Sequence, residues 1–262
     1  MKNIDHPKIE DGTVGKAMLI LELVADFDTP PRFSDIQELS PFPKASTYRL
    51  VSTLVSQNLL AMDEHTATYS MGGKLMRLAS RAWRTASLAP IAAPYIDLLS
   101  KKTGQTIHLA KLDNGQVLYL DKRNANKPVP MFSDAGKIAP AYCTGVGKAM
   151  LAFTNSETAQ RTVEQQSFYR FTKHTISSAE ELEAELLTIR QQGYAFDREE
   201  HEIGIICIAV PVLSAKGEAL AGLSITLSTR QFDFMDLQGF KPDLEETANE
   251  ISKVAGDWLL NY

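Results

Sequence analysis

The chain has 262 residues, a formal net charge of −5, a pI near 5.6 and 44% hydrophobic residues. This length accommodates two domains with separate cores, and the acidic balance excludes a protein that coats nucleic acid over its whole surface. No apolar run approaches the roughly 18 residues of a membrane span, and the polar start is unlike a secretory signal. We expect a cytoplasmic protein with no membrane contact.

Two cysteines, Cys143 and Cys207, lie far apart and have no metal-type spacing with the five histidines. Free buried thiols are the ordinary state of such cysteines in a reducing compartment. We therefore expect neither a metal nor a cofactor.

The first 72 residues predict three helices and a hairpin after a polar leader. The leader covers 1–12, the helices run from 13 to about 26, from 34 to 39 and from 44 to about 57, and the strands cover 60–62 and 68–70. Ser34 and Gln37 form a capping-box pattern at the second helix, and Pro43 can stand at or just before the start of the third. The order helix, turn, helix and hairpin is that of a winged helix-turn-helix.

The third helix can bury one flank while its N-terminal end presents polar groups, as the reading helix of a helix-turn-helix does in the major groove. The candidate DNA-contacting residues of this helix are Lys44, Ser46, Thr47, Tyr48 and Arg49. Arg49 is the candidate for a charge-assisted or bidentate contact. His65 and Thr66, at the tip of the hairpin, would lie along a phosphate backbone or minor groove.

A helix pair with a hairpin is also a common packing unit that binds no DNA. From Arg32 to Arg84, however, seven basic residues stand against four acidic ones, a net of +3 in a chain whose total is −5. This local excess suits a module that faces phosphates. Because the excess is modest, we expect dimerisation to double the contacts.

A helix predicted from Gly73 to about Ser87 carries an apolar stripe, with arginines elsewhere on its surface. The stripe consists of Leu75, Leu78, Ala79, Ala82, Trp83 and Ala86. Such a helix between two domains either packs on its own chain or pairs with its twin. We favour pairing, because a dimeric reader needs a spacer that sets the separation of its half-sites.

From about residue 88 the chain alternates helices and strands, which predicts an α+β domain on a mainly antiparallel sheet. The expected helices cover 91–102, 146–153, 157–165, 179–192 and 242–260, and the expected strands cover 106–112, 116–121, 194–197, 205–212 and 219–226. Asp113-Asn114-Gly115 marks a hairpin turn, and Gly104 and Gly193 mark helix ends.

Two segments of this domain contain groups that could bind a small ligand. Thr144 is a plausible N-cap, so Gly145, Val146 and Gly147 would present backbone N–H groups at a helix start, a ready site for a carboxylate. The alternative is that these glycines serve tight packing only. In the second segment, Asp197 ends one strand, and two other strands that can pair beside it carry polar or thiol side chains. Those side chains are Cys207, Ser224 and Thr226.

Four runs of this chain resemble the IclR family of bacterial transcriptional regulators. They are KASTYRLVSTLVSQNLL (44–60), PAYCTGVGKAMLA (140–152), FTKHTI (171–176) and GYAFDREEHEIGIICIAVPV (193–212). The resemblance extends from about Thr13 to Asn261, in the family order. It implies a winged helix-turn-helix over 12–72, a linker helix over 73–88 and a GAF-like effector-binding domain over 89–262. It also implies assembly as dimers or dimers of dimers on double-stranded operator DNA.

The resemblance further implies an effector pocket for a small carboxylate. Its residues would be Met131, Ala139, Gly145, Val146, Asp197, Ile205, Cys207, Ser224 and Thr226. The helix-start N–H groups and hydroxyls would hold the carboxylate, while Met131 and Ile205 contact the carbon skeleton. Gly145 stands where many relatives carry alanine, so we expect a roomier pocket floor. The turn at 40–43 also departs from the family, whose turn often contains glycine.

These features favour a ligand-responsive transcription factor and not an enzyme. Effector binding would shift the two helix-turn-helix domains of a dimer between one arrangement that fits the spacing of the DNA half-sites and another that does not. One alternative is a redox sensor or enzyme on a GAF-like domain, with Cys143 or Cys207 as the reactive thiol. No histidine base lies near either cysteine in sequence, which disfavours it. Another is a dimerisation module with a vestigial pocket. A repressor and an activator fit the sequence equally.

Overall fold

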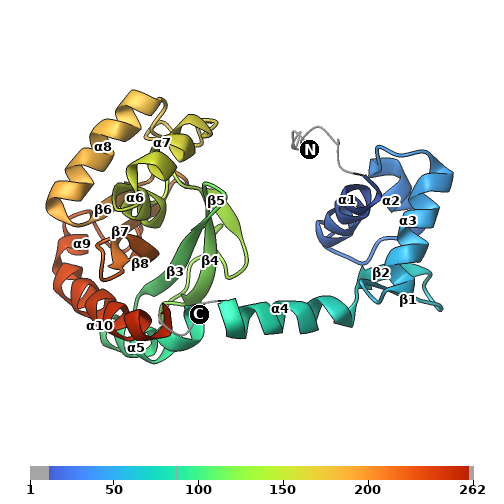
Figure 1. The fold of residues 1–262 in the computed structure, drawn as a ribbon, viewed down its shortest axis with the longest axis horizontal. Coiled ribbons are helices and arrows are strands. Elements are labelled where there is room, and N and C mark those ends of the chain that lie inside the picture. The colour runs from blue at the N-terminus through green and yellow to red at the C-terminus, as the bar shows by residue number, and fades with distance from the viewer. Residues whose placement is uncertain (1–11, 87, 260–262) are drawn as a thin grey trace. The chain divides into compact units, whose positions relative to one another are not determined.

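The computed structural model describes residues 12–86 and 88–259, and the chain divides into two compact units after Ala86 (Figure 1). All but the last residue of the predicted leader lies outside the described residues. Within the described residues, no helix combines the length and the apolar character that crossing a membrane requires.

The first unit is a three-helix head with a two-stranded wing, as predicted, followed by one further helix. Its elements are α1 (Thr13–Ala25), α2 (Phe33–Leu39), α3 (Lys44–Ser56), β1 (Leu60–Asp63), β2 (Thr68–Met71) and α4 (Gly73–Ala86). Apolar residues at helical spacing on α1 and α3 meet Ile36 of α2 and Leu60 of β1 in one core. The strands of the wing pair antiparallel.

The predicted cap of α2 by Ser34 and Gln37 was wrong. The helix begins at Phe33, and the backbone N–H of Arg32 donates to Asp35 Oδ2 at 2.8 Å. A carboxylate accepts a hydrogen bond more strongly than a neutral amide, and it also interacts favourably with the helix N-terminus. Asp35 therefore takes the role expected of Gln37.

The second unit is built on one six-stranded sheet. Its helices are α5 (Ala89–Thr103), α6 (Gly145–Ala152), α7 (Ser156–Glu164), α8 (Ala179–Gln192), α9 (Asp236–Gly239) and α10 (Lys241–Leu259). Its strands are β3 (Thr106–Asp113), β4 (Gln116–Arg123), β5 (Ile138–Pro140), β6 (Ala195–Arg198), β7 (Ile205–Leu213) and β8 (Ala219–Ser228). The strand order is β5-β4-β3-β8-β7-β6, and every neighbouring pair is antiparallel. The predicted α+β class is confirmed.

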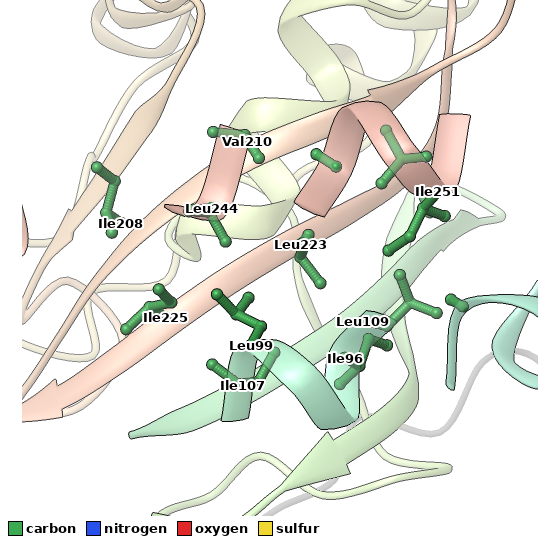
Figure 2. Close-up of a cluster of buried hydrophobic side chains, with 14 of the residues drawn as sticks. Ile96, Leu99, Ile107, Leu109, Ile208, Val210, Leu223, Ile225, Leu244 and Ile251 are labelled. Carbon is green, nitrogen blue, oxygen red and sulfur yellow. The ribbon is translucent and has the colours of Figure 1, made fainter. Parts of the chain in front are cut away.

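The two faces of this sheet differ in chemistry because side chains alternate along each strand. One face packs on α5 and α10 through aliphatic side chains, among them Ile208, Leu223 and Ile107 (Figure 2). The opposite face lies under α6, and its central residues are mostly polar. There Cys207 pairs with Thr226, and Ser224 lies between Ala209 and His108. Because β7 is covered on both faces, its sequence is apolar almost throughout.

The sequence did not predict β5 or α9. A three-residue strand that ends in Pro140 and a four-residue helix are too short to show a period of 2.0 or 3.6. The pairing of β5 with β4 nevertheless places Ala139 beside Val117, at the edge of the polar face.

Candidate functional site

The exposed N-terminal part of α3 carries three of the predicted DNA-contacting side chains. Lys44, Tyr48 and Arg49 are exposed, and Ser46 is half-buried. Phe33 of α2 supports Tyr48 edge-to-face, with 5.6 Å between ring centroids. A cation, a phenol and a hydroxyl on one helix end are suited to phosphate and base-edge contacts.

Thr47 does not belong to this surface, which corrects the prediction. Its side chain is fully buried, and its hydroxyl lies 2.9 Å from Ser40 Oγ and 3.3 Å from the carbonyl oxygen of Phe42. Thr47 therefore fixes the turn between α2 and α3. The hydrogen bonds of this hydroxyl stabilise a turn whose backbone Pro41 and Pro43 already restrict.

The tip of the wing is ordered by Asp63. Its Oδ1 accepts hydrogen bonds from the backbone N–H groups of His65 at 2.8 Å and Thr66 at 3.1 Å. These bonds hold the pKa of the Asp63 carboxyl below its usual value, and the bond from Thr66 has the larger effect. His65 and Thr66 are both exposed, as a contact with DNA requires.

A cavity lies between the polar face of the sheet, the start of α6 and the loops before β5 and β7. Seven of the nine predicted pocket residues line it, namely Gly145, Val146, Asp197, Ile205, Cys207, Ser224 and Thr226. Met131 and Ala139 are not among its lining residues, which corrects the prediction. Ala139 is packed in the core between the sheet and α6, and Phe132 and Ser133 occupy the place expected for Met131.

The start of α6 faces this cavity without a side-chain cap. Thr144 holds the N-cap position, as predicted, but its hydroxyl donates to the carbonyl oxygen of Pro140 at 2.9 Å. The first N–H groups of a helix have no partner inside the helix, and they carry the positive end of its dipole. Thr144, Gly145 and Val146 line the cavity, so this positive end borders it.

The two glycines of α6 serve different purposes. A Cβ at Gly147 would lie 2.4 Å from the carbonyl oxygen of Ala141, so this glycine permits tight backbone packing. A Cβ at Gly145 would lie 2.4 Å from Cys207 Sγ. The roomier floor expected at Gly145 is therefore wrong, because the sulfur of Cys207 occupies the space that an alanine methyl group would need.

We expect Gly145→Ala to lower the free energy of unfolding by about 1–3 kcal/mol, the usual cost of overpacking a core. Adding Cys207→Ala should recover most of this loss, since it removes the clashing sulfur. Urea unfolding of the two single variants and the double variant measures the coupling. Additive effects of the two substitutions would contradict the contact between these positions.

The sequence did not predict several other residues that line the cavity. They are His108, Tyr119, Phe132, Ser133, His201 and Glu202, while Thr144 was predicted only as the N-cap of α6. The alternation of β3 contained a signal for His108, because this side chain stands between inward-facing apolar neighbours. Which face it joins depends on the pairing with Ser224 of β8, more than one hundred residues away.

His108 is held neutral at the floor of the cavity. Its Nδ1 lies 3.2 Å from Thr226 Oγ1, and its Nε2 lies 2.9 Å from Ser133 Oγ. Burial is the main cause that lowers the pKa of His108 to about 3, and the positive charge of Lys122 is the second. At neutral pH the ring thus offers one donor and one acceptor and no charge.

A buried charge cluster adjoins the cavity. The backbone N–H of Glu200 donates to Asp197 Oδ1 at 2.8 Å. The carboxylate oxygen Oε1 of Glu200 accepts a hydrogen bond from Lys148 Nζ at 2.5 Å. Glu185 Oε1 lies 3.4 Å from the same ammonium group. Burial is the main cause that raises the pKa of Asp197, and the negative charge of Glu200 is the second. The positive charge of Lys148 opposes this rise. Lys148 on α6 thus connects the cavity wall to α8.

The two cysteines have the properties of structural thiols. Both are buried, and burial followed by the charge of Asp197 raises the pKa of each thiol far above its usual value. A protonated thiol is a poor nucleophile and reacts slowly with oxidants. This environment disfavours the redox alternative. Within the described residues no group of three or more His, Cys, Asp or Glu side chains could hold a metal ion.

A helix-turn-helix head and a separate unit with a small polar cavity define the class of ligand-responsive DNA-binding regulators. The profile of the IclR helix-turn-helix domain matches residues 13–64, and that of the bacterial transcriptional regulator IclR C-terminal domain matches residues 81–253. The chain belongs to the IclR family of bacterial transcriptional regulators.

Several known proteins are similar over nearly the whole length. The HTH-type transcriptional regulator KdgR of Escherichia coli (strain K12) is 34% identical over 261 residues, which cover 98% of each chain. XynR of the same organism is 29% identical over 244 residues, or 93% of this chain and 97% of XynR. The crystal structure of the Thermotoga maritima IclR has 30% identity and a TM-score of 0.77, and the match covers 93% of this chain and 98% of that one.

An IclR homolog from Microbacterium hydrocarbonoxydans, crystallised in complex with 4-hydroxybenzoate, shares the fold. Its TM-score is 0.78 at 21% sequence identity, and the match covers 92% of this chain and 98% of the homolog.

Proposed function

We propose that this regulator binds operator DNA through α3 and the wing, and that a small carboxylate in the cavity changes the strength of this binding. The DNA-contacting set is Lys44, Ser46, Tyr48 and Arg49 of α3 with His65 and Thr66 of the wing. Thr47 is left out because its side chain is buried. The exposure of Arg49, one turn into α3, supports its role as the main base-edge or phosphate contact.

The observation that carries the effector proposal is the uncapped start of α6. The Thr144 hydroxyl is engaged with Pro140, so the N–H groups at the helix start have no side-chain acceptor and adjoin the cavity. An anion bound there gains both hydrogen bonds and the helix dipole. The IclR homolog from Microbacterium hydrocarbonoxydans has a similar fold and was crystallised with 4-hydroxybenzoate, which is a carboxylate. This similarity supports a carboxylate as the class of ligand.

The apolar stripe of α4 supports a homodimer, or a dimer of dimers. Leu78 is 55% exposed and Trp83 is 36% exposed, which is unusual for large apolar side chains on one helix. Pairing with the same helix of a second copy would bury them and would supply the second reading head. Sedimentation velocity tests this proposal, and a monomer at micromolar concentration would contradict it.

The effector proposal is tested by thermal shift with acids and their matched amides. We expect some carboxylates to raise the melting temperature, while the corresponding amides at equal concentration do not, because an amide lacks the charge that the helix start attracts. Suitable pairs are 4-hydroxybenzoate with its amide, pyruvate with pyruvamide, and gluconate with gluconamide. Equal shifts by acids and amides, or no shift with any acid, would refute a carboxylate effector.

A further inference from the structure

The cavity is small in this structure. Its free space is about 40 Å³, where a single water molecule needs roughly 10–15 Å³ on the same measure. Pockets that hold a small organic ligand usually measure about 300–1,000 Å³. An effector can therefore enter only if part of the chain moves out of its way.

The loop before β5 fills the polar side of the cavity. Ser133 Oγ lies 2.9 Å from His108 Nε2, deep against the sheet, although Ser133 itself belongs to a surface loop. The carbonyl oxygen of Ser133 also accepts from Lys122 Nζ at 2.6 Å. The hydroxyl of Ser133 thus occupies a hydrogen-bonding position that a ligand hydroxyl could take.

The neighbouring Phe132 also lines the cavity, and it contacts the loop before β7. Its backbone N–H donates to Glu202 Oε2 at 2.9 Å, and its ring packs 5.0 Å from the ring of His201. The ring of Phe171 also lies near the His201 ring, with 4.7 Å between centroids, and the ammonium group of Lys137 lies 5.1 Å from the centre of the Phe132 ring. The loop before β5 and the loop before β7 therefore contact each other at the cavity through a hydrogen bond and through tilted aromatic rings.

Two further hydroxyls line the cavity wall. Tyr119 is 6% exposed and Ser224 is 2% exposed, yet neither oxygen is among the fully buried side-chain atoms that lack a hydrogen-bond partner in the described part of the chain. Both hydroxyls can therefore bond to a molecule that occupies the cavity. Both lie on the polar face near His108, whose ring is 5.2 Å from that of Tyr119.

We infer that Phe132 and Ser133 act as a built-in substitute for the effector, and that the effector displaces Ser133 from His108. The inference rests on the proposed carboxylate site at α6 and specifies its ligand further. A displaced Ser133 leaves His108 Nε2 without its partner, beside the hydroxyls of Tyr119 and Ser224 that also line the cavity. The effector is therefore a carboxylate that carries at least one hydroxyl or carbonyl oxygen to replace the Ser133 hydroxyl.

The first test needs no ligand. In the full-length protein, Ser133→Ala removes the bond to His108, so backbone amides of residues 131–137 should exchange with deuterium several-fold faster than in the wild type. Ser133→Thr keeps the hydroxyl and should restore slow exchange. Ser156→Ala, an exposed serine at the start of α7, is the matched control. Unchanged exchange in Ser133→Ala would overturn the inference.

The second test uses three acid pairs that differ in hydroxyl groups. They are 4-hydroxybenzoate with benzoate, glycerate with propanoate, and gluconate with hexanoate. We expect a hydroxylated acid to bind at least tenfold more tightly than its partner, and Ser133→Ala to strengthen that binding roughly three- to tenfold, the value of one hydrogen bond. Acids that bind equally well with and without hydroxyls would overturn this inference and leave the carboxylate proposal standing. No binding by any of the six acids would overturn both.

Discussion

Replacing Arg49 by alanine is expected to weaken operator binding by roughly 30-fold or more, while the protein stays folded. Arg49 is exposed on α3 and holds no ion pair among the described residues, so its loss leaves the head core unchanged. A charged or bidentate contact to DNA contributes about 1–3 kcal/mol, and a dimer makes it twice. Fluorescence anisotropy on the DNA upstream of its own gene measures the change.

The control for this experiment is Arg161→Ala, an exposed arginine of α7 in the other unit. It removes the same charge and should leave operator affinity nearly unchanged. If folded Arg49→Ala binds the operator as tightly as Arg161→Ala, then α3 is not the reading helix.

Lys148→Met is expected to lower the free energy of unfolding by about 3–5 kcal/mol, the usual cost of removing one partner of a buried ion pair. Lys148 is fully buried and neutralises Glu200, whose Oε2 already lacks a hydrogen-bond partner within the described part of the chain. Methionine has a similar volume, so the loss reports on charge and not on packing. Urea unfolding followed by circular dichroism measures it.

Lys253→Met provides the contrast. Lys253 forms an ion pair with Glu250 at the same distance of 2.5 Å, but on the surface of α10. A solvated pair contributes little, so we expect almost no change in stability. Adding Glu200→Gln to Lys148→Met should recover part of the loss because it removes the uncompensated charge. A Lys148→Met protein as stable as Lys253→Met would show that the cluster does not hold α6 in place.

The sequence predicted the fold well because local signals agree with the tertiary structure. The helical period of α3 placed Lys44, Tyr48 and Arg49 on its exposed side. The same pattern could not show that the Thr47 hydroxyl turns inward to the turn at Ser40. The sequence pattern of a threonine at a helix start is the same whether its hydroxyl contacts DNA or the preceding loop.

The cavity was predicted only in part because its floor depends on strand register. The grouping of Asp197, Ser224 and Cys207 followed from the strands expected to pair and from the family resemblance. His108 joins them only through the pairing of β3 with β8, which no local pattern specifies. The contact between Gly145 and Cys207 also depends on how α6 packs on the sheet.

Filling the cavity is expected to change the affinity of the helix-turn-helix head for DNA. The most direct measurement is the operator affinity of the wild-type protein, by fluorescence anisotropy, with and without a carboxylate that raises its melting temperature. We predict a change of roughly fivefold or more, the lower end of usual coupling between sites, and an equal effect of operator DNA on the affinity for the acid. A carboxylate that binds the protein and leaves operator affinity unchanged would contradict the account.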